Sequence, residues 1–124
     1  MSVILNFEVV GNKEIADTYS TQTLTLTGKL EREIYGLTST DGWITNSISK
    51  IGTISKIIAN VEDPADTLAT ANLRIVYDSS GIVIPINGIF VYSVDTVFAD
   101  LITSIDMSTD SVLPMNCNLS ILGV

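Results

Sequence analysis

Histidine is absent from this 124-residue sequence, and cysteine occurs once, as Cys117. Without an imidazole, the chain lacks the commonest general base near neutral pH and the Ser-His-Asp and Cys-His arrangements of nucleophilic enzymes. Most zinc sites need histidine or several thiolates, so they are excluded as well. One cysteine cannot form an intrachain disulfide, and we expect a buried, inert thiol made in a reducing compartment. The sequence therefore predicts a protein that is not an enzyme and binds no cofactor.

Positive charge is also scarce. The chain has 6 basic and 14 acidic residues, and its formal net charge is −8. Nucleic acid and anionic lipid both require clustered Lys and Arg, and no such cluster occurs. No apolar run reaches the roughly 18 residues of a membrane span, and the opening segment lacks a secretory signal. We expect a soluble protein, cytosolic at synthesis, that binds neither nucleic acid nor membrane, with its acidity serving mainly solubility.

Hydrophobic residues make up 46% of the chain and charged residues 16%. A chain of this length and composition forms a single domain, 1–124, with a core that needs no disulfide or metal. Because so few residues are charged, much of the surface must be Thr, Ser and Asn. Such a surface suits broad contact with neighbouring proteins.

Alternation of apolar and polar residues predicts strands over most of the chain. The richest segment, 72–94, is three apolar runs separated by turn sequences at 78–81 and at Asn87-Gly88, and it predicts three consecutive antiparallel strands. Segment 29–37 is ambiguous, because Leu30, Ile34 and Leu37 also fit a helical stripe; we favour a strand. The other expected strands cover 3–9, 21–27, 44–50, 54–61 and 115–124.

One short helix is expected near 96–104. Its apolar stripe follows helical spacing, and Asp95 or Thr96 can serve as the N-cap; the stripe consists of Val97, Phe98, Leu101, Ile102 and Ile105. Roughly eight strands at 8–12-residue spacing, with this one helix, are typical of an all-β antiparallel β-sandwich or a small barrel.

Two aromatic residues, Tyr35 and Trp43, flank a loop rich in Gly, Ser and Thr over 35–43. Aromatic side chains beside a polar loop can anchor a protein partner or stack on a sugar ring. The alternative is that one or both fold back onto the core. We select Tyr35 and Trp43 as candidate partner-contact residues.

Carboxylates provide two further candidate sites. Glu31 and Glu33 fall on one face of the expected strand, about 7 Å apart, but a solvated surface pair explains this spacing better than catalysis does. Glu62, Asp63 and Asp66 share a loop and could supply oxygens to Ca²⁺. Their spacing matches no EF-hand pattern, so an acidic turn is the preferred interpretation. We expect no catalytic or metal-binding residue.

The order of segments resembles that of a known protein family. After an aliphatic first strand come ADTYSTQTLTLTG, then GTISKIIANVEDPADTLATANLRIVYDSSG, INGIF, FADLITSIDM and a hydrophobic last strand. This layout is similar to that of small jelly-roll-like accessory or decoration (minor capsid) proteins in the virions of tailed bacteriophages.

The resemblance implies a jelly-roll-like sandwich and a non-enzymatic structural role in the virion, after assembly in the host cytoplasm. The expected partners are other virion proteins, such as the major capsid protein or a neck or tail component, and further copies of the chain in a homo-oligomer. A carbohydrate- or receptor-binding β-sandwich that uses Trp43 and Tyr35 is the alternative from another class.

Overall fold

The computed structural model describes the backbone of residues 2–9, 18–65 and 68–124, and the side chains of 25–65 and 68–124. The elements in chain order are β1 (Ser2–Val9), β2 (Thr18–Thr25), β3 (Gly28–Leu37), the 3₁₀ turn η1 (Ser39–Asp41), β4 (Ile44–Ser47), β5 (Ile54–Glu62), β6 (Ala71–Tyr77), β7 (Ser80–Ile86), β8 (Gly88–Ser93), α1 (Thr96–Ala99), β9 (Ile102–Thr109) and β10 (Met115–Gly123).

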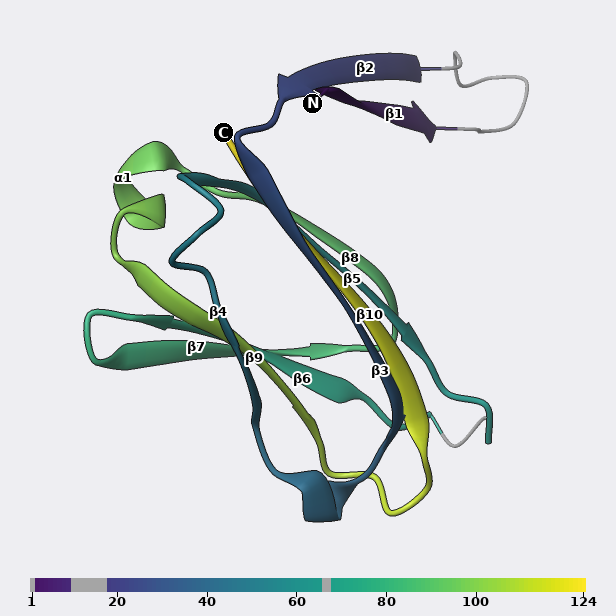
Figure 1. The fold of residues 1–124 in the computed structure, drawn as a ribbon. Helices are drawn as coiled ribbons and strands as arrows, with labels where there is room; N and C mark the ends of the chain where they lie inside the picture. Colours follow the sequence, from purple (N-terminus) through teal and green to yellow (C-terminus); the bar gives the residue numbers. More distant parts are fainter. Residues whose placement is uncertain (1, 10–17, 66–67) are drawn as a thin grey trace.

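Eight of these strands form two antiparallel four-stranded sheets that pack face to face (Figure 1). The strand orders are β3-β10-β5-β8 and β4-β9-β6-β7. Within the sandwich the first strand thus pairs with the last (β3 with β10), the second with the second-last (β4 with β9), and so on to β6 with β7. This is the arrangement of one long hairpin that has been rolled up. Rolling such a hairpin yields the two Greek keys of a jelly roll. The predicted all-β, jelly-roll-like sandwich is confirmed.

The core lies between the two sheets and is built from alternate residues of the strands. In each sheet, directly opposed residues share a face, so whole rows of side chains point inward. The largest fully buried hydrophobic side chains are Leu37, Ile54, Ile57, Leu73, Ile75, Ile105, Met107, Met115, Leu119 and Ile121. β5 lies between β10 and β8.

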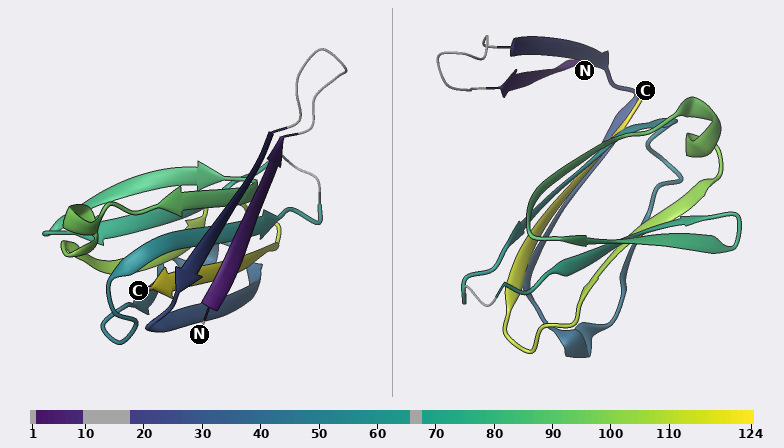
Figure 2. Two further views of the ribbon diagram at one scale, coloured as in Figure 1. Left: turned by 90° about the horizontal axis from the view of Figure 1, so that it is seen from above. Right: turned by 180° about the vertical axis from the view of Figure 1, so that it is seen from behind.

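The first two strands do not join the sandwich. β1 and β2 pair only with each other among the described strands, in register from Ser2 opposite Thr25 to Val9 opposite Thr18. Figures 1 and 2 show this β1–β2 hairpin standing apart from the two sheets, beside the C-terminal end of β10. The strands predicted at 3–9 and 21–27 are present, but as a separate ribbon.

The turn at Asn87-Gly88 is not the hairpin that the sequence predicted. β6 and β7 do form a hairpin, with Asp78 and Ser79 at positive φ in its two-residue turn. β8, however, pairs with β5 in the other sheet, so Asn87-Gly88 is a corner between sheets. Gly88 has a φ of 91°, and the Asn87 side chain donates a hydrogen bond to the carbonyl of Ala69 at 2.7 Å. An Asn-Gly pair suits a corner as well as a hairpin because both residues tolerate positive φ.

The helix expected near 96–104 is much shorter than predicted. α1 covers only Thr96–Ala99, with the Asp95 side chain accepting a bond from the Val97 amide, and β9 begins at Ile102. A β-bulge explains the misleading pattern: Thr103 is an extra residue between the pairs that Ile102 and Ser104 make with β6. The bulge places Ile102 and Ile105 on the same core-facing side, three residues apart, which imitates helical spacing.

A second bulge explains the ambiguity of segment 29–37. Tyr35 and Gly36 of β3 together oppose Asn116 of β10, so Ile34 and Leu37 both face the core. Gly36 takes a φ of 69°, and its amide donates to the Asn116 side chain at 3.1 Å. The strand was predicted correctly, but the loop expected over 35–43 begins only after Leu37.

Candidate partner-contact surface

The structure separates the two aromatic residues that the sequence paired. Tyr35 belongs to β3 and lies on the outer face of the β3-β10-β5-β8 sheet, where its side chain is 72% exposed. Trp43 follows η1 and lies against Arg74 of the other sheet, 37% exposed. They are therefore on different faces, and one partner surface cannot be centred on both.

Tyr35 lies among acidic groups. Its hydroxyl donates a hydrogen bond to Oε2 of Glu33 at 2.7 Å. This bond and the charge of Glu33, with a smaller effect of Glu62, raise the pKa of Tyr35 above its ordinary value of 10.0. Ionising the phenol would lose the bond and add a negative charge beside a carboxylate.

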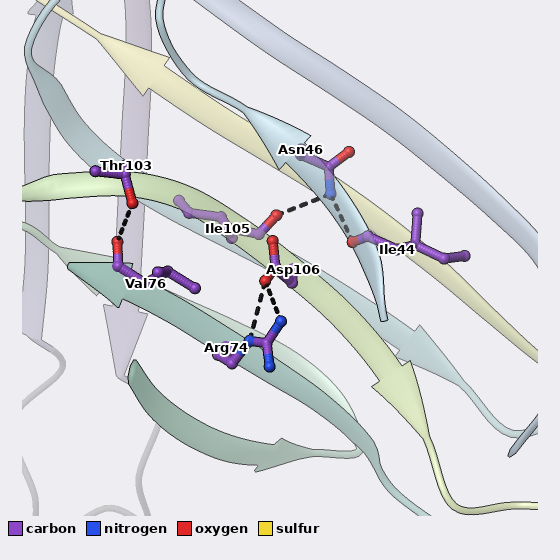
Figure 3. Close-up of polar contacts among 7 residues, drawn as sticks. All are labelled: Ile44, Asn46, Arg74, Val76, Thr103, Ile105 and Asp106. Carbon is purple, nitrogen blue, oxygen red and sulfur yellow. Dashed lines mark hydrogen bonds and ion pairs between the residues drawn. The ribbon is translucent and has the colours of Figure 1, made fainter. Parts of the chain in front are cut away.

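Trp43 is part of a three-residue stack on the outer face of the second sheet. The guanidinium carbon of Arg74 lies 4.0 Å from the Trp43 ring centroid, a cation–π contact. Arg74 in turn donates from Nε (3.0 Å) and Nη2 (2.7 Å) to Oδ2 of Asp106, as Figure 3 shows for the ion pair. Asp106 thus orients Arg74, and Arg74 packs against the Trp43 ring.

Asp106 is buried although its side chain points away from the core. Its residue exposure is 1%, and both bonds from Arg74 go to the same oxygen. The other oxygen, Oδ1, is buried and has no hydrogen-bond partner among the described residues. An unsatisfied buried oxygen costs about 1–3 kcal/mol, so the Arg74 ion pair is what makes this charge tolerable.

The outer face of the sheet on which the stack lies is almost free of charge. The outward positions of β4, β9, β6 and β7 form what we call the neutral face: Thr45, Ser47, Asn72, Arg74, Val76, Gly81, Val83, Pro85, Ser104, Asp106 and Ser108. Of these residues only Arg74 and Asp106 are charged, and they neutralise each other. The central row runs Thr45, Asp106, Arg74, Val83 across the four strands. On a chain of net charge −8, this sheet face is neutral.

A second polar contact joins the two sheets at their β3 and β4 edges. Arg32 of β3 donates to the Asn46 side chain of β4 at 3.1 Å, and the Asn46 amide donates to the carbonyl of Ile105 at 3.0 Å (Figure 3 shows the Asn46 bonds). Asn46 is buried, so its polar atoms need these partners. The contact fixes β4, the strand that follows Trp43.

The carboxylate candidates have no metal-binding arrangement among the described residues. Glu31 and Glu33 lie on the exposed face of β3, opposite Ser120 and Asn118. Within residues 2–9, 18–65 and 68–124, no three His, Cys, Asp or Glu side chains are grouped to hold an ion. Asp66, the third acidic residue of the loop that was weighed as a calcium site, lies outside the described residues.

Cys117 is buried in the core, as predicted. Burial raises the pKa of its thiol to about 11. Since the thiolate is the reactive form, the side chain behaves as a small hydrophobic residue at neutral pH.

Only weak indications of Arg74 and Asp106 as site residues are present in the sequence. Each lies between two core residues, in Leu73-Arg74-Ile75 and Ile105-Asp106-Met107, and alternation alone places them on a solvated face. The available signal was one basic and one acidic residue, each isolated in a strand of otherwise apolar or hydroxyl-bearing residues. Their pairing depends on β6 and β9 being neighbours, which the sequence does not reveal.

In the part of the chain that the structure describes, no helix has the length and apolar character needed to cross a lipid bilayer. The function must be argued from the surfaces described above. Comparison with protein-family models, with curated proteins and with solved structures found no match for this chain.

Proposed function

We propose that this protein is a non-enzymatic structural component of a bacteriophage virion, which binds and stabilises the capsid through its neutral face. Three observations support the proposal. The segment order resembles that of phage accessory proteins, the strand order is the jelly roll found in many viral capsid proteins, and an aromatic side chain, Trp43, packs on Arg74 of the neutral face. The third observation carries most weight because it identifies the residues that would contact the partner.

The stack has the properties of a binding hot spot. Trp and Arg are the residues most enriched at such positions, and rigid anchors lose little conformational entropy on binding. Trp43 is held by Arg74, and Arg74 by Asp106, so the anchor is preorganised. Exposed neighbours without charge, such as Val83 and Thr45, can be desolvated at low cost. The major capsid protein is the partner we propose.

Co-sedimentation with particles tests the proposal. Particles are assembled from the other virion proteins of the same phage, and the purified chain is added over a range of concentrations. Trp43→Ala should weaken binding at least about 30-fold, because hot-spot truncations cost about 2 kcal/mol or more. Tyr35→Ala is the matched control, since Tyr35 is an exposed aromatic residue on the opposite face.

Retention of full binding by Trp43→Ala would contradict the neutral face as the contact. If only Tyr35→Ala lost binding, the contact would instead lie on the outer face of the β3-β10-β5-β8 sheet. A wild-type chain that never co-sediments with particles would reject the structural role itself.

A carbohydrate-binding function is the second candidate. Jelly rolls also occur as lectin domains, and the partly exposed ring of Trp43 could stack on a sugar. A glycan array tests this candidate. Binding that disappears in Trp43→Ala would favour it over the capsid role, and an array without signal would reject it.

A further inference from the structure

The four edge strands of the sandwich differ in how they resist pairing with another chain. An unprotected edge strand attracts additional strands, and proteins block it with charges, proline or a very short strand. β3 carries four charged residues, including the inward-pointing Arg32. β4 is only four residues long, and β7 contains Pro85.

β8 has none of these protections. Its sequence, GIFVYS, contains no charge and no proline. It pairs with β5 on one side only, and Ile89 and Val91 on its outer face are 74% and 40% exposed. The free edge of β8 is therefore the place on the sandwich where a further strand would add.

The β1–β2 hairpin needs such an edge. It is a two-stranded sheet outside the sandwich, and isolated two-stranded ribbons are at best marginally stable in water. In β1 the sequence has an apolar residue at every second position: Val3, Leu5, Phe7 and Val9. Every second position of a strand belongs to one face, so these four residues share one face of β1; their partners in β2 are Leu24, Gln22, Ser20 and Thr18.

The hairpin cannot reach the β8 edge of its own chain. It connects to β3, at the opposite edge of the same sheet, and three strand spacings of about 4.8 Å separate β3 from β8 by about 14 Å. Only Leu26 and Thr27 link β2 to β3, and the three extended steps from Thr25 to Gly28 span at most about 11 Å. Both are also fixed, since Leu26 is buried and the Thr27 amide donates to the carbonyl of Gly123 at 2.8 Å.

Charge on the contacting strands does not oppose a second copy as the partner. Two chains of net charge −8 repel each other unless the contacting surfaces are neutral. β8 has no charged residue, and the sixteen residues of β1 and β2 contain a single one, Glu8.

We propose that the β1–β2 hairpin of one copy adds, strand to strand, to the free β8 edge of a second copy of this chain. Donor and acceptor are different surfaces, so every copy can both give a hairpin and receive one. Such a contact either closes, as a ring or a reciprocal pair, or continues as an open filament. The proposal is independent of the neutral face, which lies on the other sheet.

A complementation experiment with full-length variants tests this contact. Val91→Lys places a charge on the acceptor strand and leaves the hairpin intact, and Phe7→Asp places a charge in β1 and leaves β8 intact. Each variant alone should be a monomer by light scattering, whereas the wild-type chain self-associates. An equimolar mixture should form a 1:1 dimer, because one hairpin and one edge remain functional.

Val83→Lys is the matched control. It places the same charge on β7, an edge strand of the other sheet with 52% exposure at this position, and should leave self-association unchanged. Hydrogen exchange supplies the second readout: amides of residues 88–93 should gain protection as the wild-type concentration rises, but not in Val91→Lys.

The proposal is overturned if the wild-type chain stays monomeric, if Val91→Lys associates like the wild type, or if the mixture of variants gives no dimer. If self-association is disproved, the proposed capsid contact still stands, because Trp43 packs on one sheet and Val91 belongs to the other.

Discussion

Removing Arg74 should destabilise the protein far more than removing its partner Asp106. Arg74→Met keeps the aliphatic stem but leaves the Asp106 carboxylate without its cation. Asp106 is 1% exposed and Oδ1 already lacks a bond, so water cannot replace the lost donors. Asp106→Asn leaves a cation instead, and the Arg74 side chain is 31% exposed and can be hydrated.

The expected magnitudes follow from this asymmetry. Two unit charges about 4 Å apart attract by about 4 kcal/mol at an effective dielectric constant of about 20. Deleting one member of a buried pair costs about 3–5 kcal/mol, which we expect for Arg74→Met. Asp106→Asn keeps an acceptor for the guanidinium and should cost about 1–2 kcal/mol. The double variant Arg74→Met/Asp106→Leu removes both charges and should recover most of the loss.

Urea unfolding monitored by the fluorescence of Trp43, the single tryptophan, provides the free energies. An unchanged m-value shows that the variants are compared between the same two states. If Arg74→Met does not fold, the double variant still gives a result, because it contains no buried charge at this site. Equal losses for the two single variants, or a double variant no more stable than Arg74→Met, would refute the reasoning.

Three further predictions concern single residues. Gly123→Ala should lower the free energy of unfolding by about 3 kcal/mol or more, because its Cβ would lie 1.6 Å from the carbonyl oxygen of Ile51. Gly81→Ala is the control: the atom nearest to its Cβ lies at 3.4 Å, and the free energy of unfolding should change by less than about 1 kcal/mol. A disulfide reagent at pH 8 should modify Cys117 about 100-fold more slowly in the native protein than in urea, because burial raises the thiol pKa from 9.0 to about 11. The folded state then loses stability as pH rises from 9 toward 11, and rapid native labelling would contradict this prediction. Glu33→Gln should lower the Tyr35 pKa toward 10.0 in an ultraviolet titration, with Tyr35→Phe identifying the signal; an unchanged pKa would show that Glu33 is not the cause.

The two places where the apolar spacing fits a helix and the structure has a strand share one physical cause. A strand puts every second residue on the core side, so an odd spacing between core residues contradicts a regular strand. In β3 and β9 a bulge adds one residue, and pairs such as Ile34 and Leu37, or Ile102 and Ile105, become three apart. Since the bulge depends on the pairing partner, one strand's sequence cannot distinguish it from a helical turn.

Composition and local pattern determined the class of protein: an all-β domain with a buried thiol and no imidazole chemistry. They also located most strands, because alternation records which side of each segment is apolar. Only the tertiary structure decided which strands are neighbours, and from that followed the burial of Asp106, the neutral face and the free edge of β8. The reason is that burial of an outward residue, and exposure of an edge, depend on residues distant in the chain that come to lie beside it.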